Sequence, residues 1–456
     1  MSITINQQAT SPNLVDNTIL YTVNSNQIAQ PQFQYLCDIK TSTGTLIQRI
    51  KQQPNPSGYG VFDVGMICSY NMGPSDQVWM TNVVQTQTNC AKQFQVLFGE
   101  EYGTSVSSSV SIYNGVTNVT GGLPPAQSGR TYYYMLGGTL DPNDKLNWNW
   151  PSSSKYYDTE INDSTFNYQV GLTDFPATQS IRRNDWATIS TLNGNVHGAT
   201  NSDEFAQDIY AMVVNQYDVT GSLVISNTYY NVSTGADNGG PRANSTQLWA
   251  QVYTLQSQET RLIHWPVGPK NIDEGPGLEA DTSYYDVIFY EQATDGFIND
   301  NGIYGKYRFE IVSPECGYDG VRFAWKNKYG VWDYFNFGLA QTTNDSIERN
   351  EFKQNFVNYS TSTGTVVYDK GRRGLSQYVN KINKLRTAES NWLTQDDADV
   401  IRELFFSTEV FIQNGVEFLP VVIRNGGLTE KTNPRTQKLF KYTVEYQLAN
   451  DTQNRI

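Results

Sequence analysis

The sequence contains few of the side chains on which most enzymes depend. It has two histidines, His197 and His264, which lie far apart in the chain. Histidine is the most frequent general acid or base, and the short motifs of serine hydrolases, zinc proteases and P-loop proteins are also missing from the sequence. His264 stands within the apolar stretch 261–267, a context typical of a packed or turn residue. We therefore expect no catalytic residue and no cofactor.

Carboxylates offer only weak indications of a reactive or metal site. Glu100 and Glu101 are adjacent, and neighbouring residues of a strand point to opposite faces, so these two could not flank a glycosidic bond as a pair. A glycosidase that takes its carboxylates from distant strands remains an alternative. The oxygen-rich segments 141–144 and 299–302 lack the spacing of a calcium loop and are more typical of Asx-turns, so we expect no metal.

Cysteine and long apolar runs are scarce as well. The four cysteines form no Cys-x-x-Cys pair, which argues against a zinc ribbon or redox motif and predicts reduced side chains packed as small hydrophobic groups. No stretch approaches the roughly 18 apolar residues of a transmembrane helix, and residues 1–8 lack the basic and apolar segments of a secretory signal. We expect no membrane insertion, and assembly in a cytoplasm.

Charge is low and mostly negative. Charged residues make up 17% of the chain, below the usual share of about a quarter, and the formal net charge is -13. Such a chain is poorly suited to broad contact with nucleic-acid phosphates, so we expect no direct nucleic-acid binding. One basic segment departs from this balance and is either a solvated connector or a docking patch for an acidic neighbour. Its basic residues are Lys370, Arg372, Arg373, Lys381, Lys384 and Arg386.

Aromatic and small polar residues are abundant instead. The chain has 30 Tyr and 20 Phe, and much of the remainder is Asn, Gln, Ser, Thr and Gly. Aromatic and β-branched side chains pack on pleated sheets, while Asn, Gly and Ser form turns. The composition therefore predicts a mainly β protein, and 456 residues are too many for one ordinary domain.

The first block, residues 1–120, is predicted to be β-sandwich-like, with an arm or first strand over 1–20. Residues 33–39 alternate at a period of two, which predicts a half-buried strand, and residues 45–51 return as the second strand of a hairpin. Several such short strands separated by turn signals are typical of a sandwich. A segment rich in Gly, Pro and Ser, 121–129, ends the block.

The second block, residues 121–309, is predicted to be a further β domain with long loops. Its strand candidates are 132–136, 211–214, 222–225, 247–252 and 284–290. Trp148 and Trp150 stand in a loop of this block, where they either stack on sugar rings or fill a core or an interface.

The third block, residues 310–456, is predicted to be an α+β domain with one helix. Thr394 is a good N-cap for a helix over 396–406, whose apolar side chains form a stripe suited to packing on a sheet. Asn414-Gly415 is a strong signal for a hairpin turn, and the closing run 439–450 alternates as a strand.

Segments throughout the chain resemble one protein family. In the third block they are 321–337, 391–400 and 439–450, and nearer the N-terminus they are 54–63 and 98–102. In these segments the chain is similar to virion structural proteins of tailed phages that infect Bacteroidota, including crAss-like phages. The similarity covers most of the chain and is weakest in the middle. These are fold-type motifs, so they transfer no catalytic residue.

The resemblance implies a non-enzymatic virion component of the tail, baseplate or neck. Such a protein is expected to form a symmetric ring of identical copies, to contact other virion proteins and to be assembled in the host cytoplasm. The 1–20 arm and the 370–386 segment are our candidates for reaching a neighbour. The alternatives are a receptor- or glycan-binding module, with Trp148 and Trp150 as contacts, and a polysaccharide-degrading tail enzyme.

Overall fold

A computed structural model describes a large part of the chain, and the structural statements that follow concern the described residues. They are 3–7, 13–16, 18–41, 43–73, 85–87, 91–103, 110–112, 131–135, 171–192, 209–230, 262–273, 277–292, 298–314, 320–353, 357–368, 371, 374–426, 439–450 and 453–455. The protein is mainly β, as the composition predicted. The chain divides into two compact units, 1–312 with 326–333, and 313–325 with 334–456.

The N-terminal part of the first unit contains two sheets. One has the strand order β1 (Ile3–Gln7), β3 (Leu20–Ser25) and β6 (Gly60–Asp63). The other has the order β2 (Asn13–Leu14), β10 (Thr131–Met135), β8 (Ala91–Glu101), β4 (Gln34–Thr41) and β5 (Leu46–Gln52), and β9 (Val110–Ile112) also pairs with β8. Both sheets contribute side chains to one hydrophobic core, which includes Val23, Tyr35, Phe62 and Phe98. This arrangement is the predicted sandwich-like fold.

Strand β4 is buried on both faces, whereas its alternating sequence predicted a half-buried strand. Tyr35, Cys37 and Ile39 are fully buried on one face, and Leu36 and Asp38 are buried on the other. Asp38 tolerates this position because Arg49 of β5 stands opposite it and donates two hydrogen bonds to its carboxylate, at 2.6 and 2.8 Å.

The remainder of the first unit contains a second pair of sheets. The larger has the order β11 (Thr178–Ile181), β17 (Ile298–Ile311), β16 (Tyr284–Gln292), β13 (Ile209–Tyr217) and β14 (Leu223–Tyr230). The smaller contains β12 (Thr188–Leu192), β15 (Leu262–Pro266) and β7 (Gln85–Gln87). Trp265 of β15 packs edge-on against Phe289 of β16, with ring centroids 5.5 Å apart, so aromatic side chains fill the space between the two sheets.

Two sequence predictions about the first two blocks need correction. The predicted boundary after residue 120 does not separate the sheets, because β10 pairs with β8 in the N-terminal sheet and β7 pairs with β15. Residues 299–302, predicted as a turn, lie inside β17. Both errors arise because strand pairing over long sequence distances leaves no local signal. The strand predicted over 247–252 and the oxygen-rich segment 141–144 lie outside the described residues.

The second unit is built on an eight-stranded sheet. Its order is β19 (Trp332–Phe337), β18 (Val321–Lys326), β24 (Val410–Asn414), β25 (Glu417–Ile423), β26 (Thr443–Leu448), β23 (Leu375–Glu389) and β20 (Gln341–Lys353), and β27 (Gln453–Arg455) also pairs with β23. Residues 326–333, from the end of β18 into β19, count with the first unit. Phe323 contacts the rings of Phe337 and Tyr446, which places part of the aromatic core on this sheet.

Helix α5 (Gln395–Phe406) accompanies this sheet, as the sequence predicted. The Thr394 hydroxyl accepts a hydrogen bond from the Asp397 amide, the expected N-cap. Val400, Ile401 and Leu404 are buried, and Phe405 packs against Tyr442 at a centroid distance of 5.8 Å. Two shorter helices, α1 (Gly65–Ser69) and α4 (Pro269–Asp273), are the other helices that the described residues contain.

Candidate interaction surface

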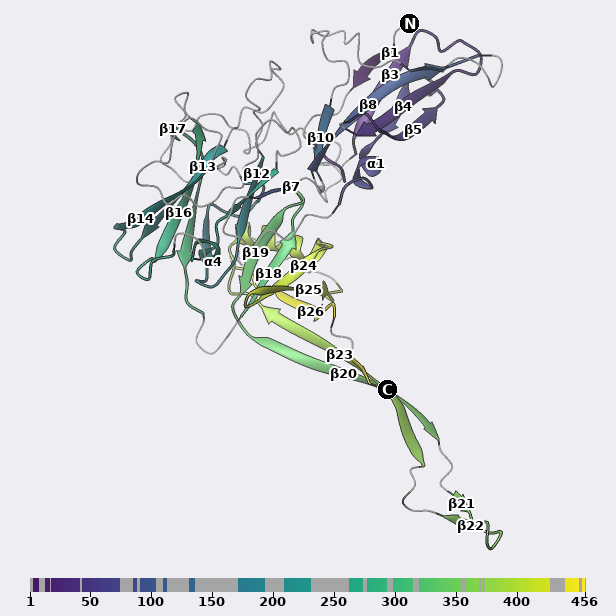
Figure 1. The fold of residues 1–456 in the computed structure, drawn as a ribbon, viewed down its shortest axis with the longest axis vertical. Helices are drawn as coiled ribbons and strands as arrows, with labels where there is room; N and C mark the ends of the chain where they lie inside the picture. Colours follow the sequence, from purple (N-terminus) through teal and green to yellow (C-terminus); the bar gives the residue numbers. More distant parts are fainter. Residues whose placement is uncertain are drawn as a thin grey trace. The chain divides into compact units, whose positions relative to one another are not determined.

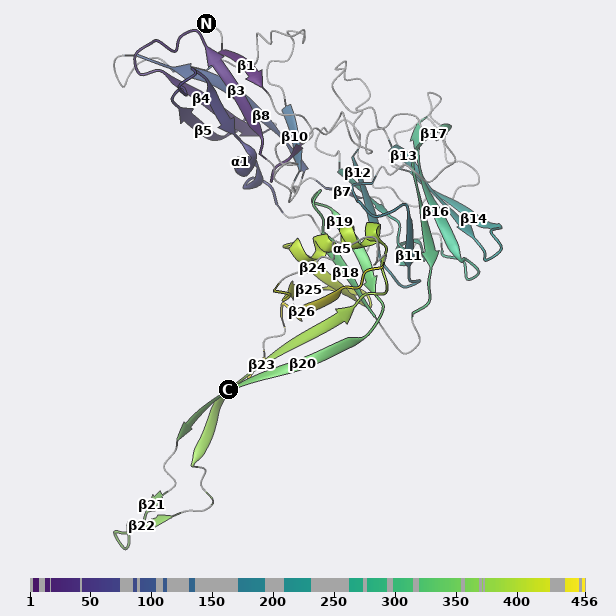
Figure 2. The same cartoon turned by 180° about the vertical axis from the view of Figure 1, so that it is seen from behind.

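Strands β20 and β23 form a two-stranded ribbon, and β20 is exposed along its whole length. The strands contain 13 and 15 residues, and they pair from Gln341 opposite Ala388 to Lys353 opposite Leu375. Figures 1 and 2 show both strands leaving the rest of their sheet side by side. Near its base β23 also pairs with β26, and further along it pairs with β27. Strand β20 is the last strand of the sheet in the described part of the chain.

The sequence of β20 explains why this strand has no buried face. All of its residues except Ile347 and Phe352 are polar, so neither face of the strand is apolar enough to attract a covering layer. All thirteen residues are exposed, including Ile347 at 43% and Phe352 at 45%. The ribbon is held mainly by its backbone ladder, with a side-chain hydrogen bond of 2.5 Å between the hydroxyls of Thr342 and Thr387.

A second hairpin follows β20 along the chain. It consists of β21 (Val357–Tyr359) and β22 (Val366–Tyr368), which pair in antiparallel register. Tyr359, Val366 and Val367 expose more than half of their surface. An isolated two-stranded hairpin is marginally stable in water, and its exposed apolar side chains make it a candidate contact surface.

The predicted basic segment lies partly in this ribbon. Residues 375–386 belong to β23, so this part of the segment is a strand. Lys384 stands opposite Asp345, Lys381 opposite Glu348, and Arg386 opposite Thr343 in the strand register. Acidic positions of β20 therefore complement basic positions of β23. Lys370, Arg372 and Arg373 lie outside the described residues, as do Trp148 and Trp150.

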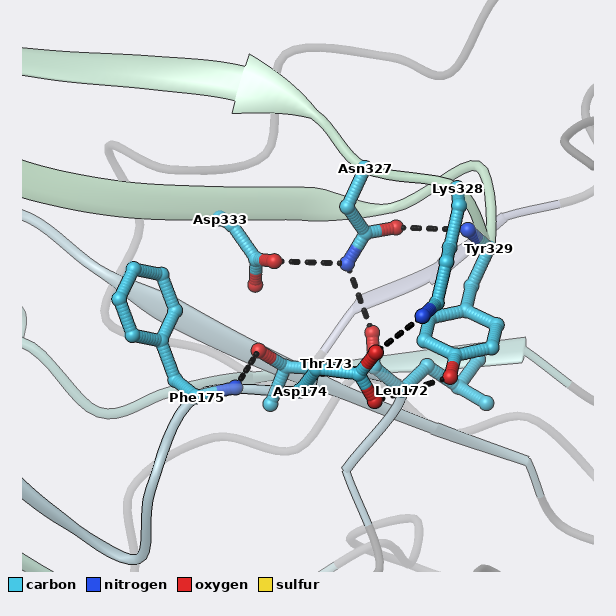
Figure 3. Close-up of polar contacts among 8 residues, drawn as sticks. All are labelled: Leu172, Thr173, Asp174, Phe175, Asn327, Lys328, Tyr329 and Asp333. Atoms are coloured by element: carbon cyan, nitrogen blue, oxygen red, sulfur yellow. Dashed lines mark hydrogen bonds and ion pairs between the residues drawn. The ribbon is translucent and has the colours of Figure 1, made fainter. Parts of the chain in front are cut away.

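A polar cluster forms around the turn between β18 and β19, and we call it the turn cluster (Figure 3). Its residues are Leu172, Thr173, Asp174, Phe175, Asn327, Lys328, Tyr329 and Asp333. All of them belong to the first unit. The sequence around this turn gave no sign of its partner, the loop that begins at Gly171.

Asn327 is the centre of the turn cluster. Its side-chain oxygen accepts hydrogen bonds from the amides of Tyr329 and Val331, at 3.0 and 3.2 Å, which closes the turn. Its side-chain nitrogen donates to the Leu172 carbonyl at 2.8 Å and to the Asp333 carboxylate at 3.0 Å. All four hydrogen-bonding positions of this buried amide are used, so it joins two segments 155 residues apart in the sequence.

Asp174 binds the other side of the same turn. Lys328 forms an ion pair with its carboxylate, and the Tyr329 hydroxyl donates to it at 3.0 Å (Figure 3). The loop is fixed further by the Gly171 amide, which donates to the Tyr307 hydroxyl at 2.7 Å. Burial raises the pKa of that hydroxyl, so it stays protonated. The turn cluster is a structural contact because hydrogen bonds satisfy its groups from within the chain.

His264 has the geometry of a packed residue. It lies on β15 opposite Ser190 of β12, is fully buried, and its Nδ1 is 2.6 Å from the Ser190 hydroxyl. Desolvation lowers its pKa to about 3, so the ring is neutral at physiological pH. A buried serine–histidine pair of this kind cannot reach a substrate, in agreement with the expectation of a packed histidine.

The two adjacent glutamates also separate as strand geometry requires. Glu100 is fully buried and accepts a hydrogen bond of 2.5 Å from the Ser25 hydroxyl, while Glu101 forms an ion pair of 2.5 Å with Lys51 at the surface. Cys37 and Cys68 are free and buried, as predicted for packed cysteines. Burial raises the pKa of the Cys68 thiol to about 12, which keeps it protonated.

The described residues contain no group of three or more His, Cys, Asp or Glu side chains that could hold a metal ion. None of their helices combines the length and the apolar character that a membrane span requires. No protein-family model matches the sequence, and no relative is found among curated proteins. The fold and the candidate surface therefore define a mainly β protein with sandwich-like sheets and an exposed two-stranded ribbon.

Proposed function

We propose that the chain is a structural, non-enzymatic component of a tailed-phage particle, in its tail, baseplate or neck. In this proposal it works as a ring of identical copies that also contact other virion proteins. The resemblance of segments such as 321–337 and 439–450 to virion structural proteins supports the kind of particle. The observation that carries the assembly role is the ribbon.

The ribbon supports an assembly role because folding of the chain buries little of its surface. Its thirteen β20 residues are all exposed, and the apolar side chains of Ile347, Phe352 and Leu375 are in contact with water. Ordering a strand costs about 1–2 kcal/mol per residue in backbone entropy, and burial of side chains normally offsets that cost. A neighbouring subunit would supply the missing burial, as in other interfaces that use exposed strands.

Charge supports the same proposal. Residues 341–389 contain eight Lys and Arg against five Asp and Glu, which gives a net charge of +3. With a total of -13, the rest of the chain has a net charge of -16. A basic extension on an acidic protein is complementary to another copy of the same protein, and such complementarity favours association between copies in a ring.

The proposal is tested with a ribbon-deleted variant in which Asn-Gly replaces residues 344–385. Thr343 and Arg386 are opposite each other in the register, so a two-residue turn can join them and keep the pairing of β23 with β26. We expect the variant to fold and to be absent from particles when it replaces the wild-type chain during infection. The wild-type chain should be present in purified particles, and a reconstruction of the particle should show its copies arranged as a ring.

Two results would overturn the proposed function. One is the absence of the wild-type chain from purified particles. The other is release of oligosaccharide from capsular polysaccharide by the purified chain, with loss of that activity after a single carboxylate-to-amide change. Incorporation of the ribbon-deleted variant at the wild-type level would instead show that the ribbon is not needed for assembly.

A further inference from the structure

The outer edge of β20 has the features of a strand-pairing site. In the described structure β20 pairs with β23 on one side, and no strand follows it on the other. Alternate backbone N–H and C=O groups of an edge strand point away from its sheet and can pair with another strand. Five of the thirteen residues are charged, which normally discourages such pairing unless the partner presents the opposite charges in register.

We propose that β20 pairs with β20 of a second copy of this chain, antiparallel and centred on Ile347. Ile347 is the middle residue of the strand, so this register overlaps all thirteen residues. The two ribbons then form one continuous sheet in the order β23, β20, β20 and β23. The inference rests on the sequence and register of the ribbon and goes beyond the proposed function.

The charges of β20 select this register. In an antiparallel pair centred on Ile347, Asp345 of each copy stands opposite Arg349 of the other, and the contact occurs twice. No like charges face each other, because Glu348 meets Ser346 and Glu351 meets Thr343. A pair centred on Glu348 would place that residue opposite itself and Asp345 opposite Glu351. Neither Asp345 nor Arg349 has an ion-pair partner among the described residues.

The apolar side chains agree with the same register. Asp345, Ile347 and Arg349 lie on one face of β20 because they are two residues apart. Ile382 of β23 stands opposite Ile347 in the ribbon. The proposed pairing therefore aligns four isoleucines across four strands, flanked by the two Asp–Arg pairs. Exposed aliphatic surface on Ile347 would be buried between ion pairs, which gives the contact both affinity and a fixed register.

The extra residue in the ribbon does not interfere with this edge. Asn350 pairs with Val379 and Glu351 with Gln377, so the additional residue, Tyr378, belongs to β23. The bulged strand is therefore the inner one, and β20 keeps regular spacing along its free edge. A two-fold contact of this kind joins copies in pairs, and it would act in addition to the head-to-tail contacts that close a ring.

Charge exchange between two variants provides the first test. In a self-pair of the Asp345→Arg variant two arginines stand opposite each other, and in a self-pair of Arg349→Asp two aspartates do. We expect each purified variant alone to self-associate about tenfold more weakly than the wild type in analytical ultracentrifugation. A mixture of the two variants should associate as the wild type does, because an Asp345→Arg copy that faces an Arg349→Asp copy has an Arg–Asp pair at both contacts.

In a mixture the contact also occurs twice, and each occurrence joins two unlike copies. When an Asp345→Arg copy meets an Arg349→Asp copy, each of the two contacts joins an arginine of the first copy to an aspartate of the second. The mixture is therefore expected to associate as the wild type does, although neither variant does so alone. The double variant that carries both Asp345→Arg and Arg349→Asp restores an Arg–Asp pair at both contacts, so it should self-associate as the wild type does.

A cysteine scan provides the second test and depends on register alone. The symmetric contact places Ile347 opposite itself, at a Cα separation of about 4.5–5.5 Å that suits a disulfide. Ile347→Cys should therefore form a covalent dimer on mild oxidation of the full-length chain. Gln341→Cys, at the end of the strand and opposite Lys353, should not, and the wild type controls for the native cysteines.

Two outcomes would overturn the inference. One is a double charge variant that associates no better than either single variant. The other is an Ile347→Cys chain that gives no more covalent dimer than Gln341→Cys. Both results concern the purified chain, so they are separate from its presence in a particle, which tests the proposed function. Binding of β20 to an unlike virion protein without self-association would produce both outcomes.

Discussion

At the scale of single residues, two buried aspartates are paired with arginines of neighbouring strands. Asp286 of β16 stands opposite Arg308 of β17, which donates to its two carboxylate oxygens at 2.7 and 3.0 Å. The arrangement repeats that of Asp38 and Arg49 in the N-terminal sheet. A bidentate pair of this kind fixes the register of two strands, since a slip of one residue would separate a buried carboxylate from its cation.

Removal of one partner should therefore be costly. Asp286→Ala leaves Arg308 and the nearby Lys306 facing an apolar methyl group, and Asp286 is 1% exposed. We expect a loss of about 3 kcal/mol in the free energy of unfolding, measured by urea denaturation. Asp281→Ala, at an exposed position, is the matched control and should change stability by less than about 0.5 kcal/mol. Equal effects of the two changes would contradict the role of the pair.

His264 predicts a pH dependence of stability. Its folded pKa is about 3 and its ordinary value is 6.5, so between these values the unfolded chain binds a proton that the folded chain does not. Stability should therefore fall as the pH drops below about 6.5, by up to about 1.4 kcal/mol per pH unit. His264→Asn keeps a polar group beside Ser190 and does not titrate. Its stability should decline less steeply between pH 6.5 and 5 in urea unfolding, and parallel curves would refute the assignment.

At the scale of elements, long-range contacts decide where loops and helices lie. The loop from Gly171 to Phe175 is held by the turn cluster and by Tyr307, with no regular structure of its own. Helix α5 is fixed differently, by a stripe of buried side chains and the Thr394 cap. The first element depends on a few directed hydrogen bonds, whereas the second depends on apolar area.

Asn327→Ala should release the Gly171–Phe175 loop. The change removes four hydrogen bonds, including those that the Asn327 side chain donates to the Asp333 carboxylate and the Leu172 carbonyl. We expect faster amide hydrogen exchange in residues 171–175, including the Leu172 amide, with little change in the second unit. Lys328→Ala removes one ion pair and is the milder comparison. An unchanged exchange pattern in Asn327→Ala would show that the loop is held by other contacts.

Leu404→Asp tests the packing of α5. Leu404 is fully buried, so the substitution would bury a charge with no partner in place of an apolar side chain. We expect a loss of about 3 kcal/mol or more in thermal unfolding of the second unit. Phe406→Asp is the matched control, because Phe406 is half exposed at the end of the same helix. Similar melting of both variants would mean that the buried stripe is misplaced.

At the scale of the whole molecule, the strands differ in how far they are buried, and we propose that the exposed β20 is the region that associates. The sheets of the two units contain the buried aromatic residues, whereas β20 has no buried residue. We expect the ribbon-deleted variant to melt within about 2 °C of the wild type, because the deleted segment buries little apolar surface. Differential scanning calorimetry measures this directly. A large decrease in melting temperature would show that the ribbon is part of the folded core.

The sequence by itself determined the elements that have local signals. Alternation at a period of two predicted β4 and β26, Asn414-Gly415 predicted the hairpin of β24 and β25, and Thr394 predicted the start of α5. These signals act between residues close in the chain, where the propensity of a few side chains is sufficient. The mainly β fold was predicted from composition, which also reflects the propensities of individual side chains.

Tertiary structure alone decided which distant segments meet. The polar strands of the ribbon carry no amphipathic period, so strand pairing and not a local pattern makes them strands. The basic charge of 381–386 was visible in the sequence, but its position opposite Asp345 and Glu348 depends on the register of β23 against β20. Asn327 and Leu172 are 155 residues apart, and nothing in either neighbourhood encodes their contact. Such contacts depend on the shape and burial that the complete fold provides, which no short stretch of sequence contains.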